Sequence, residues 1–183
     1  MSQSNPVNRR RRWRALLVLA IASALMVPSA ALAEFNGGTG PSPTAPGADA
    51  QLLPNGDAVP PAGAPPQVVR AIEFANRIND KPYKWGGGHS SWKLDKGYDC
   101  SGAVSYALHG AGRKVLKAPM PSGSFANWGK PGEGEWITVY TNAGHMYSVI
   151  AGLRWDTSGG DGPRWHEDER SPSGFKARHY PGL

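Results

Sequence analysis

The sequence has a single cysteine, Cys100, among its 183 residues. One cysteine excludes an internal disulfide framework, and in an exported chain it leaves either an intermolecular bridge or a free thiol. An oxidising compartment endangers an idle exposed thiol, so we expect Cys100 to be either used or buried. The alternative to a reactive residue is a small, buried apolar filler.

Acidic residues are absent from the start of the chain. The first 33 residues hold five of the 20 basic residues and no acidic one. The remaining residues carry 15 basic and 14 acidic side chains, a net charge of +1, although the whole chain has +6. No basic patch remains that would indicate nucleic-acid binding. The charged stretch around His166 has too few organised ligands for a metal, and we expect no cofactor of any kind.

The chain has little long hydrophobic sequence beyond residues 15–33, which are 19 uncharged residues. That length would also suit an uncleaved membrane anchor. Its apolar core, residues 15–27, is short, however; it follows an arginine cluster and leads to the small-x-small site Ala31-Leu32-Ala33. We therefore predict a cleaved signal peptide over residues 1–33 and no stable membrane insertion of the mature protein.

Residues 34–65 contain seven prolines and six glycines. Such a composition buries too little apolar surface to offset chain entropy, which predicts a disordered linker. Residues 66–183 are then a single domain, long enough for one hydrophobic core.

The periodicity of the domain predicts helices first and strands later. Apolar residues at helical spacing predict helices over 66–78 and about 100–109. Short β-branched and aromatic runs predict strands over 136–140, 145–151 and 154–157, with a last one near 175–178. Together they indicate an α+β fold with N-terminal helices packed on a small antiparallel sheet.

Cys100 is placed where the second helix begins, within Asp99-Cys100-Ser101-Gly102. A thiol in the first helical turn faces the positive end of the helix dipole and unpaired backbone N–H groups. Both favour the thiolate, which is the form that attacks carbonyl carbon. A catalytic cysteine also needs a base within reach.

His145 is the best candidate for that base, because it opens a strand directly after Gly144. If residues 151–152 or 152–153 form a two-residue hairpin turn, Asp156 shares the face of His145. With the turn at residues 151–152, which is the tighter register, the two residues are diagonal neighbours. A carboxylate there would hold the imidazole tautomer. A three-residue turn would place Asp156 on the opposite face.

The other four histidines are weaker candidates. His89, in a glycine-rich loop near Cys100, stays possible as a base. His109, nine residues beyond Cys100, is interpreted as a partner for the helix dipole. His166 is interpreted as part of a solvated loop, and His179 as part of the terminal tail.

These segments, in this order, resemble the NlpC-type cell-wall peptidases, a papain-like family that cleaves peptidoglycan stem peptides. The resemblance covers about residues 66–157. Its elements are an aromatic–Gly-Gly stretch, Asp-Cys-Ser-Gly, a Pro-x-x-Ser loop, a Gly-His strand start and a polar residue one hairpin later. Here they are Tyr83-Lys84-Trp85-Gly86-Gly87, Asp99-Cys100-Ser101-Gly102, residues 119–122, Gly144-His145 and Asp156.

The resemblance implies a papain-like fold with Cys100 as nucleophile, His145 as base and Asp156 as the residue that orients it. It also implies a substrate and oxyanion site, which comprises Tyr83, Trp85, Gly86, Ser101 and Ser122. The chain departs from the family in three places. The third catalytic position is most often histidine in the family, and residues 89–97 lengthen the loop before Cys100. Met120 stands where the family often has arginine in its substrate loop.

The sequence therefore predicts a monomeric, exported cysteine endopeptidase, secreted or wall-associated, that acts on peptidoglycan peptides without a cofactor. One alternative is a non-catalytic wall-binding domain that retains the fold. Another is an amidase or acyltransferase that acts on a different amide with the same residues.

Overall fold

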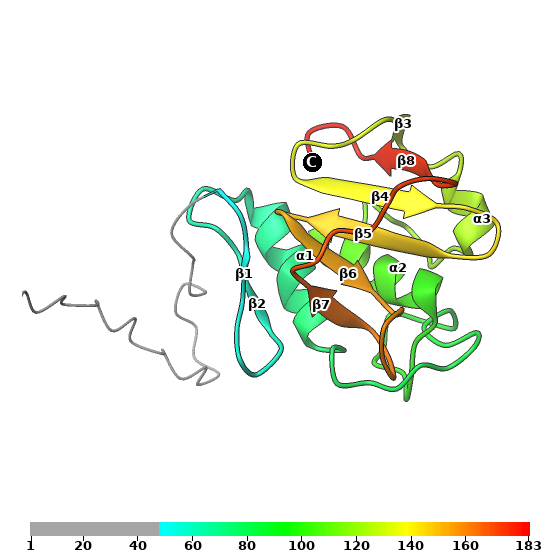
Figure 1. The fold of residues 1–183 in the computed structure, drawn as a ribbon. Coiled ribbons are helices and arrows are strands. Elements are labelled where there is room, and N and C mark those ends of the chain that lie inside the picture. The colour runs from blue at the N-terminus through cyan, green and yellow to red at the C-terminus, as the bar shows by residue number, and fades with distance from the viewer. Residues whose placement is uncertain (1–47) are drawn as a thin grey trace, which may run out of the picture. The chain divides into compact units, whose positions relative to one another are not determined.

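The computed structural model describes residues 48–183 (Figure 1). The predicted signal peptide and residues 34–47 of the predicted linker lie outside the described residues. The helices are α1 (Pro66–Asn76), α2 (Cys100–Ala111) and the short α3 (Ser122–Phe125). The strands are β1 (Gln51–Leu52), β2 (Ala58–Val59), β3 (Lys130–Pro131), β4 (Ile137–Thr141), β5 (Met146–Ile150), β6 (Leu153–Asp156), β7 (Arg164–His166) and β8 (Lys176–His179).

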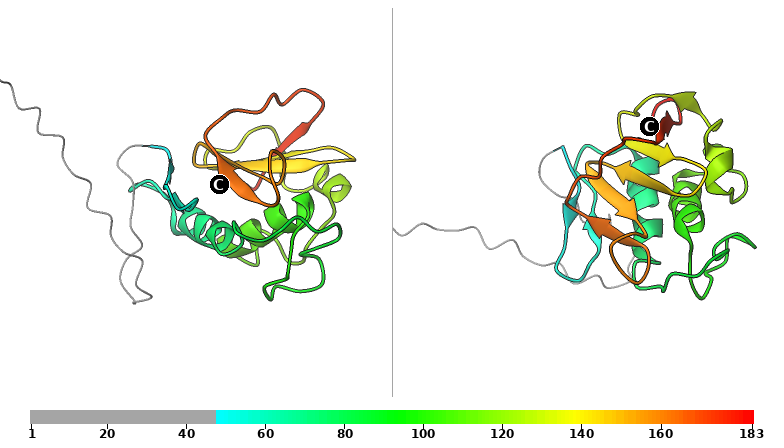
Figure 2. Two further views of the ribbon diagram at one scale, coloured as in Figure 1. Left: turned by 60° about the horizontal axis from the view of Figure 1, so that its bottom comes forward. Right: turned by 45° about the vertical axis from the view of Figure 1, so that its right-hand side comes forward.

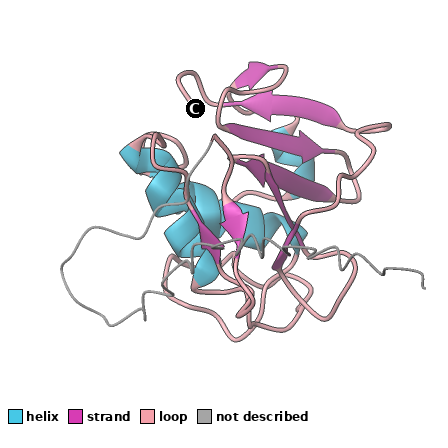
Figure 3. Ribbon diagram, turned by 60° about the vertical axis from the view of Figure 1, so that its left-hand side comes forward, coloured by secondary structure: helices cyan, strands magenta, loops and turns pink. Residues whose placement is uncertain are grey.

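Six of these strands form one antiparallel sheet in the order β3-β8-β4-β5-β6-β7. Helices α1 and α2 pack against each other and cover one face of this sheet, as the left view of Figure 2 shows. Figure 3, with helices in cyan and strands in magenta, shows the same two layers from another side. The predicted α+β class, with N-terminal helices on an antiparallel sheet, is confirmed.

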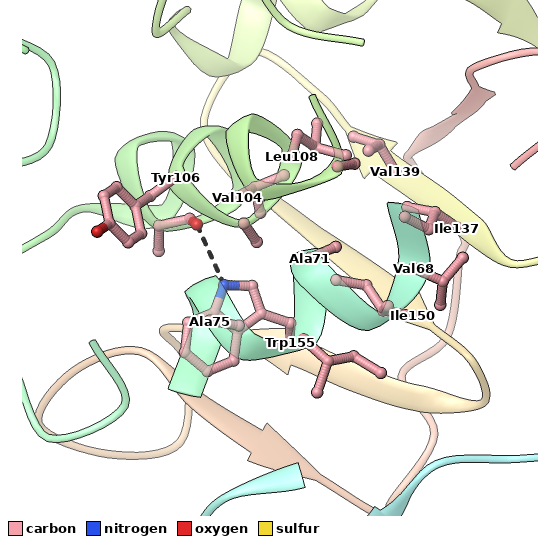
Figure 4. Close-up of a cluster of buried hydrophobic side chains, with 14 of the residues drawn as sticks. Val68, Ala71, Ala75, Val104, Tyr106, Leu108, Ile137, Val139, Ile150 and Trp155 are labelled. Carbon is pink, nitrogen blue, oxygen red and sulfur yellow. Dashed lines mark hydrogen bonds between the residues drawn. The ribbon is translucent and has the colours of Figure 1, made fainter. Parts of the chain in front are cut away.

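The core lies between the two helices and the sheet (Figure 4). Trp155 of β6 is fully buried there, and its indole Nε1 donates to the carbonyl oxygen of Ala103 in α2 at 3.2 Å. Burial of each large apolar side chain contributes roughly 1.5–3 kcal/mol. The other core side chains that Figure 4 labels are Val68, Ala71, Ala75, Val104, Tyr106, Leu108, Ile137, Val139 and Ile150. This packing fixes the start of α2 relative to β5 and β6.

Two parts of the chain that were predicted to be loops are ordered. Residues 51–59 form the β1–β2 hairpin, so the disordered linker does not extend through them. The side chain of Asn76 holds this hairpin, because its amide donates to the Ala58 carbonyl and accepts from the Ala58 N–H. The backbone of Ala50 also donates to Ala151 at 2.7 Å, which ties the hairpin to the end of β5.

The second correction concerns the stretch around His166, which was predicted to be a solvated loop. Residues Arg164–His166 are instead strand β7, which pairs with β6 at the edge of the sheet. Trp165 accounts for this, because its ring is buried against Trp155 and its Nε1 donates to Asn76 at 2.8 Å. The partner of Trp165 is 89 residues away, so local sequence does not reveal the pairing.

Candidate active site

Cys100 is the first residue of α2, as predicted. Asp99 caps the helix, because its carboxylate oxygen Oδ1 accepts a hydrogen bond from the Gly102 N–H at 2.7 Å. A Cβ atom at Gly102 would clash with the carbonyl oxygen of Gly87. Position 102 therefore requires glycine, because the turn that contains Gly87 packs directly on the first turn of α2. The helix runs on past Gly110, whose carbonyl accepts from Arg70 of α1, to Ala111.

The sulfur of Cys100 lies just beneath the surface. The residue retains 9% of its exposure, whereas Tyr83 beside it is 44% exposed. Burial first, and then the negative charges of Cys100 and Asp99, raise the pKa of Tyr83. The tyrosine backbone is fixed as well, because Tyr83 pairs with Tyr98 in an isolated bridge one residue before Asp99.

His145 lies between Asp156 and Cys100. Its ring nitrogen Nε2 is 2.9 Å from Asp156 Oδ1, which leaves Nδ1 for the thiol. Hydrogen bonds with Asp156, and next with Cys100, raise the pKa of His145 to about 9, against the opposing effect of burial. The imidazole is therefore protonated at neutral pH. Asn142 fixes the strand entry, since its side-chain oxygen accepts from the N–H groups of Gly144 and His145.

The hairpin between β5 and β6 has the tighter of the two predicted registers. Ile150 pairs with Leu153 across the two-residue turn Ala151-Gly152, and both turn residues have positive φ, 46° and 84°. Such a turn matches the twist of the flanking strands. Asp156 consequently lies on the face of His145, as a diagonal neighbour within hydrogen-bonding reach.

Asp156 is a fully buried carboxylate that accepts five hydrogen bonds. On Oδ1 the donors are His145 Nε2 and the Ser158 backbone N–H. On Oδ2 they are Ser158 Oγ, Arg154 Nη1 at 2.7 Å and Arg170 Nη1 at 2.9 Å. Burial opposes ionisation of Asp156, but the hydrogen bonds from His145 and Ser158 outweigh it and hold its pKa well below the usual range. Asp156 is therefore ionised wherever the protein is folded near neutral pH.

The two arginine partners of Asp156 belong to the candidate site, and the sequence analysis missed both. Arg154 could have been found, because it lies two residues before Asp156 on the same strand and so shares its face. Arg170 gives no such signal, since it comes from the segment between β7 and β8 and reaches Asp156 only in the folded protein.

The residues predicted for the substrate and oxyanion site fall into two groups. Ser101 Oγ and the Gly86 N–H are already bonded to Asp99, at 3.0 Å each, so they hold the start of α2 in place. Trp85 is 84% exposed at the tip of the turn before Gly86. Ser122 begins α3 and its hydroxyl lies 3.5 Å from the Ala143 carbonyl, close to the start of β5.

The other histidines do not face the thiol. His89 Nε2 lies 2.9 Å from Asp99 Oδ1 and 3.2 Å from Ser101 Oγ. His109 stacks on Trp92 at 4.0 Å, and burial, followed by Arg113, lowers its pKa, which disfavours the charge that a dipole partner needs. His179 belongs to β8 rather than to a loose tail. His145 is therefore the histidine that meets Cys100.

Two further features of residues 48–183 bear on the class of site. No group of three or more His, Cys, Asp and Glu side chains in this part of the chain could hold a metal ion. No helix in the same residues has the length and apolar character needed to cross a membrane.

The chain is similar to peptidoglycan endopeptidase RipB from two strains of Mycobacterium tuberculosis, with 32% identity over 137 residues in each comparison. The match covers 62% of this chain and 56% of the relative, so the chain spans about half the length of the curated proteins it matches. No protein-family model matches the sequence. In sequence and in fold, the chain resembles the NlpC-type peptidoglycan endopeptidases.

Proposed function

We propose that this protein is an exported cysteine endopeptidase that hydrolyses amide bonds in peptidoglycan stem peptides. The observation that carries the proposal is the chain of contacts from Cys100 through His145 to the buried Asp156. The similarity to a peptidoglycan endopeptidase supports the choice of substrate class. The predicted signal peptide, residues 1–33, supports an extracytoplasmic location, secreted or bound to the wall.

In the proposed reaction, the sulfur of Cys100 attacks the carbonyl carbon of a peptide bond, and the carbonyl oxygen takes up the negative charge. The Cys100 backbone N–H, in the unpaired first turn of α2, is suited to stabilise that oxyanion. The tetrahedral intermediate collapses, the C–N bond breaks, and the His145 imidazolium gives its proton to the leaving amine. A thioester between Cys100 and the acyl group remains.

Neutral His145 then takes a proton from water, whose oxygen attacks the thioester carbon. The C–S bond breaks and releases a peptide with a free carboxylate, which restores the thiolate and the imidazolium. Asp156 keeps its charge throughout and holds the ring by its hydrogen bond to Nε2. The rim of the site, Tyr83 and Trp85, offers two exposed aromatic side chains for contact with the substrate.

The test is incubation of the mature protein with purified sacculi, followed by measurement of released amino groups and mass spectrometry of the products. We expect new amino groups from the wild type and none from Cys100→Ala or His145→Gln. Ser124→Ala, an exposed change in α3, is the matched control and should keep full activity. Hydrolysis that survives Cys100→Ala would end the proposal.

The same assay separates the alternative functions. Binding to sacculi without any released amine would favour a wall-binding domain over an enzyme. Products in which the acyl group is joined to another amine, rather than to water, would identify an acyltransferase.

A further inference from the structure

The segment of residues 167–175, here called the strap, connects β7 to β8, and its first residues, 167–169, belong to the stretch that was predicted to be a solvated loop. In Figure 1 it runs across the strands of the sheet, and the left view of Figure 2 shows it on the face opposite α1 and α2. Tyr147 and Asp156 lie on this face, because their neighbours Ser148 and Trp155 point toward the helices and strand residues alternate. The strap therefore covers the outer side of the His145–Asp156 pair.

Arg170 is the residue of the strap that reaches the carboxylate. Its Nη1 atom donates to Asp156 Oδ2 at 2.9 Å and also to Ser158 Oγ. Its guanidinium carbon lies 5.4 Å from the ring centres of both Tyr147 and Phe175. A planar cation held by two rings and a carboxylate has one available orientation, although the side chain remains 32% exposed.

Phe175, at the end of the strap, contacts the other member of the pair. Its ring meets His145 edge-on, with centres 6.3 Å apart, and meets Tyr147 in the same manner at 5.2 Å. Arg170 thus supports Asp156 directly and supports the ring that lies beside His145. One residue of the strap is linked to both groups that the proposed reaction needs.

We infer that Arg170 is a positioning residue, which fixes the Asp156 carboxylate and, through it, the orientation and charge of the His145 imidazole. This inference rests on the proposed function. Arg154 cannot replace Arg170, because its guanidinium is shared between Asp156 and Asp168. Ser158 cannot replace it either, since Arg170 itself bonds the Ser158 hydroxyl.

The charge of Arg170 has a defined effect on the imidazole. A cation beside Asp156 offsets part of the negative field that the carboxylate exerts on His145. Removal of that cation leaves the field less compensated, which stabilises the imidazolium and makes it a weaker acid toward the leaving amine. The charged or titratable groups that face the pair are Cys100 on α2, Tyr147 on β5, Arg154 on β6, His166 on β7, and Asp168 and Arg170 on the strap.

The test compares Arg170→Met, Arg170→Lys and Arg77→Met in the full mature protein. Arg77 is the matched control, because it also lies over an aromatic ring, Phe74, at 4.3 Å, but at the end of α1. The first measurement is an NMR titration of the His145 ring, identified by its absence in His145→Gln. The second is steady-state hydrolysis of soluble peptidoglycan fragments, with kcat and KM determined separately.

We expect Arg170→Met to raise the pKa of His145 by about half a unit to one unit, the effect of one partly screened charge nearby. It should lower kcat about 10-fold with little change in KM, since the loss affects proton transfer rather than binding. Arg170→Lys keeps the positive charge but loses the planar guanidinium with its several N–H donors. The pKa of His145 should therefore match the wild type, while kcat falls. Arg77→Met should change neither quantity.

A wild-type titration and a wild-type kcat in Arg170→Met would overturn the inference. If Arg170→Met does not fold, Arg170→Lys decides, because a folded lysine variant with wild-type kcat would equally overturn it. The titration needs no turnover. A protein that hydrolyses nothing, yet shows the expected His145 shift, would refute the proposed function while supporting the positioning role.

Discussion

The stability of this protein should fall as the pH rises from 6.5 through about 9, because of the His145–Asp156 hydrogen bond. The pKa of His145 is raised from 6.5 to about 9 in the folded protein, so the folded state holds this proton more tightly than the unfolded chain. The resulting stabilisation is complete below pH 6.5, declines as the pH rises above it, and is lost above about pH 9.

The size of this effect follows from the two values. The difference between 6.5 and about 9 corresponds to about 3.4 kcal/mol in the free energy of unfolding. Solvent screening reduces it, because 23% of the His145 side chain is exposed, and we expect about 2 kcal/mol. With a urea dependence of about 2 kcal/mol per molar, the unfolding midpoint should drop by about 1 M.

The assay is urea unfolding at a series of pH values, with Cys100→Ala as the background so that the thiol does not titrate. In this background the Asp156 hydrogen bond, the largest cause of the raised pKa, is retained, whereas the contribution of Cys100 is lost, so the drop in the midpoint should be smaller than the value for the wild type. The control is Cys100→Ala combined with His145→Gln, which keeps every other titrating group. The midpoint should fall with pH in the first protein and stay nearly level in the second. Equal slopes in both proteins would refute the reasoning.

The remaining predictions concern other parts of the molecule. Gly102→Ala should lower stability by about 3 kcal/mol or prevent folding, because the added methyl group would clash with the Gly87 carbonyl. The control Gly123→Ala has open space around it and should change stability by less than about 0.5 kcal/mol. Chemical unfolding measures both variants, and equal effects would contradict this account. Trp85→Ala should raise KM on sacculi about 10-fold and leave thermal unfolding unchanged, since the ring is exposed at the rim; an unchanged KM would remove Trp85 from the substrate site. N-terminal sequencing of the exported protein should begin at Glu34, and a protein that keeps its first 33 residues would favour the membrane anchor.

Local signals in the sequence were sufficient to predict the start of α2, and they limited the β5–β6 hairpin to a few turns, of which the structure has the tighter two-residue one. Asp99 and Gly102 supply the cap and the small residue that a helix start beneath a packed loop requires. A two-residue turn leaves one choice for the face of Asp156. Both features depend on residues within a few positions of one another, which explains why sequence patterns reveal them.

The features that the sequence did not reveal depend on distant partners. Strand β7 exists because Trp165 fills a space beside Trp155 and bonds Asn76 in α1. The strap holds three consecutive acidic residues, one arginine, one proline and one glycine, a composition typical of solvated loops. Arg170 has a fixed place only through the buried Asp156 and the rings of Tyr147 and Phe175. Long-range pairing of this kind leaves no periodicity in the sequence.

The most direct test of the central claim, that His145 activates the sulfur of Cys100, is the rate of iodoacetamide alkylation at pH 6 in the wild type and in His145→Gln. Because the chain has one cysteine, every label reports on Cys100. We predict a wild-type rate about 10-fold faster than that of the variant, since the imidazolium favours the reactive thiolate. Equal rates in two folded proteins would show that the imidazole and the sulfur do not act together.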